Sequence, residues 1–175
     1  MIRGARIAFL LLLLYWTWRF VAYPMREDVI GESVLHLPDL IFHEAGHILF
    51  SPFGVFMTTL GGSLTQVLVP IACAIAFLTT SRDIFGAAVM AWWTGQNLLD
   101  VAIYINDARA LQLTLVGGHT GAEVEGHDWE RILTMTNALH LDHRIAMAVQ
   151  IAGAVLMVTS LAWAGAIAAR RGSTS

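Results

Sequence analysis

Four long apolar segments constrain the fold of this chain more than any other feature. They cover about residues 7–23, 62–80, 84–105 and 145–169, and each is close to the ~20 residues that a helix needs to cross the hydrocarbon core of a bilayer. Of the 175 residues, 57% are hydrophobic and 13% are charged. This composition predicts an all-α integral membrane bundle in which residues 1–175 form a single domain with the lipid bilayer as its surroundings.

A fifth segment, about residues 34–50, is shorter and contains the motif His43-Glu44-Ala45-Gly46-His47. Four residues advance about 400° along a helix, so the two histidines share a face one turn apart and can bind one metal ion. Glu44 lies beside them, where it can accept a proton from a metal-bound water. The motif therefore predicts a Zn²⁺ site with His43 and His47 as ligands and Glu44 as general base.

The apolar setting of this motif strengthens the prediction. An ionised group near the centre of a bilayer costs roughly 2.5–3.5 kcal/mol on insertion scales, so adjacent polar groups there require a function. The alternative is a pair of buried histidines that hydrogen-bond to each other without a metal, and this pairing is costly in apolar surroundings.

The path of the motif segment through the membrane has two solutions, a full crossing or a helix that enters and returns. With a re-entrant motif helix there are four transmembrane helices, and the basic residues near their ends gather on one side, which the positive-inside rule makes cytoplasmic. These residues are Arg3, Arg6, Arg82, Arg170 and Arg171. We therefore predict four spans and a re-entrant motif helix.

A catalytic zinc site usually has a third protein ligand. Asp100 belongs to a polar stripe in the third apolar segment, and intramembrane carboxylates usually face the interior of a bundle, so we predict Asp100 as this ligand. His127 is the alternative. Asp128 is a third candidate, although its position before an expected helix over residues 129–139 favours a role as N-cap. Asn97 and His127 are also predicted catalytic residues, as hydrogen-bond donors to a developing oxyanion, and Gln96 is a further alternative for this role.

Gly61 and Gly62 lie at the start of the second apolar segment, and two interpretations of them are possible. They permit either close packing of two helices or a loop that lines a substrate channel and offers an edge to an extended substrate.

The whole chain has a net charge of −3 and contains no run of basic residues. We therefore expect no nucleic-acid partner.

The histidine motif, the later Gly-Gly stretch and the run Asn97-Leu98-Leu99-Asp100 together resemble the site-2 protease group of intramembrane metalloproteases. In that family two motif histidines and an aspartate on a later span bind zinc, and the motif glutamate is the general base. The resemblance implies these roles for His43, His47, Asp100 and Glu44. It also implies a membrane protein or peptide as substrate and a bacterial-type inner membrane as location.

Three functions agree with these features. The leading one is a zinc-dependent peptidase that hydrolyses peptide bonds in or near the bilayer. A metal-dependent lipid amidase or related hydrolase is the second, because the same activated water attacks any carbonyl. The third is a non-enzymatic membrane scaffold that binds a metal. The sequence does not define the substrate, the cleavage site or the oligomeric state.

Overall fold

The computed structural model describes residues 2–25, 27–31 and 33–170, and its regular structure over these ranges consists of helices alone, without a β-strand. The predicted all-α fold is confirmed for this part of the chain. The helices are α1 (Ile2–Ala22), α2 (Glu27–Ile30), α3 (His36–Phe50), η1 (Ser51–Phe53), α4 (Val55–Ala76), η2 (Phe77–Ser81), α5 (Ile84–Asn106), α6 (Asp128–Met135), η3 (Leu139–Leu141) and α7 (Asp142–Ala169).

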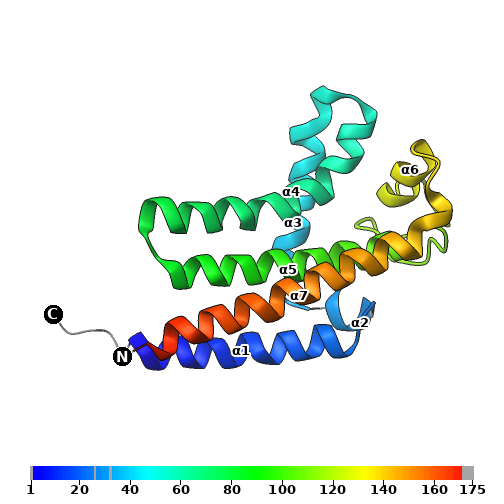
Figure 1. The fold of residues 1–175 in the computed structure, drawn as a ribbon. Coiled ribbons are helices and arrows are strands. Elements are labelled where there is room, and N and C mark those ends of the chain that lie inside the picture. Colours follow the sequence, from blue (N-terminus) through cyan, green and yellow to red (C-terminus); the bar gives the residue numbers. More distant parts are fainter. Residues whose placement is uncertain (1, 26, 32, 171–175) are drawn as a thin grey trace.

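Helices α1, α5, α7 and the C-terminal part of α4 lie side by side (Figure 1). The start of α1, the α4–α5 connection and the end of α7 share one end of this bundle, and α2 and α6 lie toward the other. Arg6 lies 3.9 Å from the Asp83 carboxylate and 4.8 Å from the ring centroid of Phe85, which fixes α1 beside that connection. Arg171 and the side chain of Arg3 lie outside the described residues.

Helix α5 runs through the middle of the bundle and packs closely on α7. At their crossing, a Cβ atom on Gly95 would lie only 2.8 Å from the carbonyl oxygen of Gly153, so small residues allow the two backbones to approach. On another side of α5, Trp92 Nε1 donates a 2.7 Å hydrogen bond to the buried Thr17 Oγ1 of α1. These contacts hold α5 as a fixed wall for the site described below.

Three helical segments are long and apolar enough to cross a membrane: Gly4–Ala22, Val55–Ser81 and Leu139–Ala169. They correspond to the predicted segments 7–23, 62–80 and 145–169. The predicted segment 84–105 is the helix α5, which is not among these three segments. Of its polar side chains, Gln96 and Asn97 are buried, whereas Asp100 and Tyr104 line the cavity described below. The count of four spans and the re-entrant path of the motif helix stay predictions.

Helices α3 and α4 form a hairpin, joined by η1, whose backbones meet at glycines. A Cβ atom on Gly46 would collide with the carbonyl oxygen of Gly61 and come within 2.6 Å of Thr65 Oγ1. Gly61 and Gly62 are buried inside α4, where the helix uses their backbone groups. Close helix packing is confirmed for Gly61, whose Cβ atom would meet Gly46 and Phe50 of α3, and the edge for an extended substrate is wrong because both glycines lie inside a helix.

We expect Gly46→Ala to destabilise the protein, because the added methyl group meets a backbone carbonyl that cannot move without separating α3 from α4. Overpacking of this kind costs about 1–3 kcal/mol. Gly165→Ala in α7 is the matched control: its Cβ meets nothing within 4 Å, and alanine in a helix is favoured over glycine by up to ~1 kcal/mol. Thermal unfolding in detergent measures both. Equal midpoints for the two variants would contradict the close packing.

Candidate metal centre

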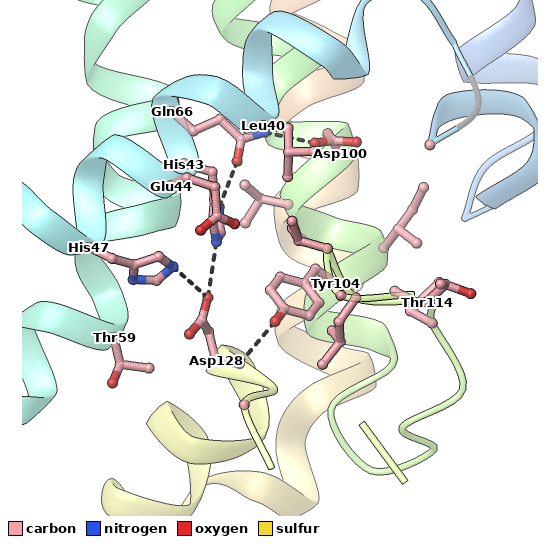
Figure 2. A pocket seen from close by; sticks show the side chains of 18 of the residues that line it. Leu40, His43, Glu44, His47, Thr59, Gln66, Asp100, Tyr104, Thr114 and Asp128 are labelled. Atoms are coloured by element: carbon pink, nitrogen blue, oxygen red, sulfur yellow. Dashed lines mark hydrogen bonds and ion pairs between the residues drawn. The ribbon is translucent and has the colours of Figure 1, made fainter. Parts of the chain in front are cut away.

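The two motif histidines point toward one carboxylate. His43 and His47 project from α3, and Asp128 from the start of α6 (Figure 2). The Asp128 Oδ2 atom lies 3.0 Å from His43 Nε2 and 3.2 Å from His47 Nε2. The centroids of the imidazole rings are 4.9 Å apart, and their nitrogen atoms bind other groups, so the alternative of a mutually hydrogen-bonded pair is wrong.

Each imidazole uses its other nitrogen, Nδ1, for a hydrogen bond that selects a tautomer. His47 Nδ1 lies 2.8 Å from the carbonyl oxygen of Thr58, which can only accept, so Nδ1 carries the hydrogen. His43 Nδ1 lies 3.1 Å from Gln66 Oε1. That amide is oriented by its Nε2 atom, which donates to Asp100 Oδ2 at 2.7 Å. In neutral His43 and His47, Nε2 therefore presents a lone pair to the Asp128 carboxylate.

Three lone pairs that converge on one point are stabilised by a positive charge, which either a proton on an imidazole or a metal ion can supply. Two ligands about 2 Å from a zinc ion at a tetrahedral angle are themselves about 3.3 Å apart, which is close to the separations of 3.0 Å and 3.2 Å found here. The outer partners of both histidines also match those of zinc-binding histidines, which usually donate their second N–H to an oxygen atom. The donor set thus fits a divalent metal ion.

Because Gly62 of α4 has no side chain, there is room beside it for the imidazole rings of His43 and His47. A Cβ atom at this position would lie 2.6 Å from His43 Nε2 and 2.7 Å from His47 Cε1. A side chain on residue 62 would therefore push both rings away from Asp128. The second glycine of the Gly-Gly stretch serves the site directly, whereas the first serves helix packing.

Asp128 is held in place by contacts at the start of α6. Its backbone N–H donates to the Tyr104 hydroxyl at 3.0 Å, and the next residue, Trp129, donates from Nε1 to Ser63 Oγ of α4 at 3.0 Å. Burial alone would raise the pKa of the Asp128 carboxyl, but the hydrogen bonds and positive charge that His43 and His47 offer when protonated outweigh it and hold this pKa below its ordinary value. Asp128 is thus an anion aimed at the histidines.

The prediction that Asp128 caps this helix is wrong. His127 is the N-cap, and its Nδ1 accepts a 3.1 Å hydrogen bond from the backbone N–H of Glu130. Asp128 is the first residue of α6, which leaves its side chain free to reach α3. Helix α6 also ends at Met135, before the predicted limit at residue 139.

Asp100 is separated from His43 by the side chain of Gln66, which contacts both residues. Its Oδ2 accepts from Gln66, as described, and its Oδ1 lies 2.9 Å from His36 Nδ1. A chain of polar contacts therefore runs from His36 through Asp100 and Gln66 to His43. The role of Asp100 as a direct ligand stays a prediction, and in this structure the carboxylate next to both motif histidines is that of Asp128.

Asn97 and His127 do not face the histidine pair. The fully buried Asn97 donates from Nδ2 to the backbone oxygen of Trp93, one turn earlier in α5. Burial lowers the pKa of His127, whose Nε2 lies 3.3 Å from Asp107 Oδ2 but without hydrogen-bond geometry. Neither residue lines the cavity at the site, so this placement lends no support to their predicted catalytic roles.

A cavity of about 610 Å³ opens in front of the histidines. Glu44, whose side chain is exposed, lines it together with both histidines, Tyr104 and Asp128. Atoms of His43, Glu44 and His47 that could bind a metal lie within 4.8 Å of one another. The opposite wall includes the mainly apolar loop of residues 113–117. Water, a metal ion and an elongated molecule can therefore meet at Glu44.

Sequence reasoning missed Gln66 and underrated Asp128 as a ligand. Gln66 carried a usable signal: it is a large amide in a long stretch without any charged residue, and such polar groups in apolar helices usually face a site. The contact between His36 and Asp100 could not be found from spacing, because the two residues lie 64 positions apart.

Comparison of the chain with models of protein families, with curated proteins and with solved structures found no match. What this site can do chemically therefore follows from its own residues.

Proposed function

We propose that this protein is a membrane-embedded, zinc-dependent peptidase similar to the site-2 protease group. The observation that carries the proposal is the convergence of His43 Nε2, His47 Nε2 and Asp128 Oδ2, with Nδ1 of each ring already bound to an oxygen atom. Asp128 takes the place of Asp100 as third ligand. A carboxylate and two imidazoles are a common ligand set of catalytic zinc, with one position left for water.

Glu44 is the general base of the proposed reaction. A zinc ion in this site would supply Lewis acidity to a carbonyl group and acidify a water molecule. Glu44 accepts the proton of the attacking water and then gives it to the leaving amine, a role that suits a carboxylate exposed to the cavity. His43 and His47 hold their positions throughout, because Gln66 and Thr58 bind their second nitrogen atoms.

Tyr104 is the proposed donor to the developing oxyanion, in place of Asn97 and His127. Its hydroxyl oxygen already accepts from the backbone N–H of Asp128, so its own hydrogen atom can be donated. The residue lines the cavity, and its ring centroid lies 6.0 Å from that of His43. A hydrogen bond that strengthens as negative charge develops lowers the barrier of acyl transfer.

The proposed substrate is a peptide segment in extended form. A helix hides its amide groups in internal hydrogen bonds, so a membrane segment has to unwind before hydrolysis. The cavity is bounded by α3 on one side and by the loop of residues 113–117 on the other. Its mixed lining of apolar side chains and polar groups suits a chain that carries both apolar side chains and peptide groups.

The direct test is metal removal and restoration. We expect the purified protein to contain about one zinc per chain, to lose cleavage of single-span peptides after treatment with a chelator, and to regain it with Zn²⁺. Magnesium is the control, because it prefers oxygen ligands and should not restore activity. Release of fatty acid from membrane lipids without peptide cleavage would instead indicate a lipid hydrolase. A protein that binds no zinc would refute the proposal.

A further inference from the structure

The end of the α3–η1–α4 hairpin exposes a group of large apolar side chains. We name this group the apolar tip; its members have exposed fractions between 38% and 77% and are Ile48, Leu49, Phe53, Val55 and Phe56. Ile41 extends the same exposed side along α3 with an exposed fraction of 68%. In Figure 1 this hairpin projects away from the helices of the bundle. No described part of the chain covers the apolar tip.

The sequence around the apolar tip is free of charge over a long distance. Between Glu44 and Arg82 there is no Asp, Glu, Lys or Arg. A surface that faces water usually mixes apolar residues with charged ones, and large exposed apolar patches mark contact with a membrane or a partner. The absence of charge on the whole hairpin end favours hydrocarbon as the partner, because protein interfaces keep a polar rim.

The apolar tip is also continuous with a membrane segment. Val55 and Phe56 begin the 27-residue helical segment Val55–Ser81, which is apolar enough to cross a bilayer. At 1.5 Å per residue such a segment is about 40 Å long, whereas the hydrocarbon core is about 30 Å thick. A segment of this length can tilt within the membrane or extend along it, and its first two residues, Val55 and Phe56, are apolar.

We propose that the apolar tip is inserted into the hydrocarbon layer of the bilayer and is covered by lipid, not by protein. The end of the hairpin then lies in lipid together with the crossing segment that begins there. Glu44 lies on α3 between the motif histidines and the lipid-facing stripe of Ile41 and Ile48, so the cavity would open close to lipid. The inference concerns the surface alone and holds whether or not the site binds a metal.

Spin-label accessibility in reconstituted vesicles tests this insertion. The single cysteine is first removed with Cys73→Ala, and a nitroxide is then attached to Phe53→Cys. Val158→Cys, on the exposed face of the membrane segment of α7, is the lipid reference, and Met135→Cys, at the end of α6 outside the membrane segments, is the water reference; both native side chains are about half exposed. Val55→Cys replaces Phe53→Cys if the latter does not fold.

We expect the label at residue 53 to behave like the label at residue 158. Its collision rate with oxygen, which concentrates in lipid, should exceed its collision rate with a water-soluble nickel chelate, and the label at residue 135 should show the reverse order. A label at residue 53 that follows residue 135 would overturn the proposal. Shielding from both reagents, with dipolar broadening between labels of two chains, would also overturn it, because a second copy would then cover the apolar tip.

Discussion

The variant Asp128→Asn is expected to lose most of its zinc, whereas Asp100→Asn keeps about one zinc per chain. Asparagine at residue 128 removes the negative charge next to both Nε2 atoms. Asparagine at residue 100 changes a partner of Gln66, and loss of an outer partner typically costs 10–100-fold in metal affinity. We therefore expect the affinity of Asp128→Asn to fall by more than ~100-fold, measured by competition with a chromophoric chelator.

The matched control for this pair is Glu123→Gln, which neutralises an exposed carboxylate outside the cavity lining and should leave zinc affinity unchanged. Thermal unfolding of the metal-free variants separates loss of a ligand from loss of the fold. The opposite order, with zinc lost in Asp100→Asn and kept in Asp128→Asn, would restore Asp100 as the third ligand and refute the arrangement proposed for the resting site.

The local part of the site was predictable because it depends on helix geometry alone. His43 and His47 are four residues apart on α3, and helical periodicity places them on one face whatever the rest of the chain does. Asp128 was harder to predict because it is 85 positions away from His43. Its approach depends on how the loop after α5 returns toward α4, where Trp129 and Ser63 meet. Tertiary contacts of this range leave no periodic signal in a sequence.

The start of α6 shows how a sound local rule can fail. Aspartate is a favoured N-cap residue, and this preference predicted that Asp128 caps the N-terminus of the helix. The neighbouring His127 takes that position through its ring nitrogen, and Asp128 gains two histidine partners instead. A neighbouring residue thus supplies the cap, which typically contributes about 1 kcal/mol, and the aspartate makes a long-range contact instead.

The bundle was predictable from hydropathy, although hydropathy does not show which apolar helix is interior. Segments 7–23, 84–105 and 145–169 all read as lipid-compatible, yet α5 packs between its neighbours and carries its polar residues inward. The orientation of Gln66 was equally ambiguous, because its partners His43 and Asp100 lie on other helices and far away in the sequence. Only the packing of α3, α4 and α5 brings His43, Gln66 and Asp100 into one chain of hydrogen bonds.

Glu44→Gln is expected to abolish most hydrolysis while it leaves the metal in place. Glutamine has nearly the shape of glutamate but cannot accept the proton of the attacking water, and a positioned general base typically contributes 10²–10⁴-fold to the rate. We expect the single-turnover rate of peptide cleavage to fall by about that factor with zinc content unchanged. Glu44→Asp, which keeps the carboxylate on a shorter side chain, should retain a rate between the two.

The combination of zinc content and rate in Glu44→Gln distinguishes the remaining functions. His43→Ala should lose both metal and cleavage, because the ring is a ligand, whereas Glu44→Gln should lose cleavage alone. A scaffold that only binds metal would give no turnover for Glu44→Gln to reduce. If Glu44→Gln cleaved peptides at the full rate, the base would have to be another group, although the ligand set of His43, His47 and Asp128 could still stand. Because Glu44 is exposed to the cavity and the ligands are packed against α4 and α6, the two roles can be separated by mutation.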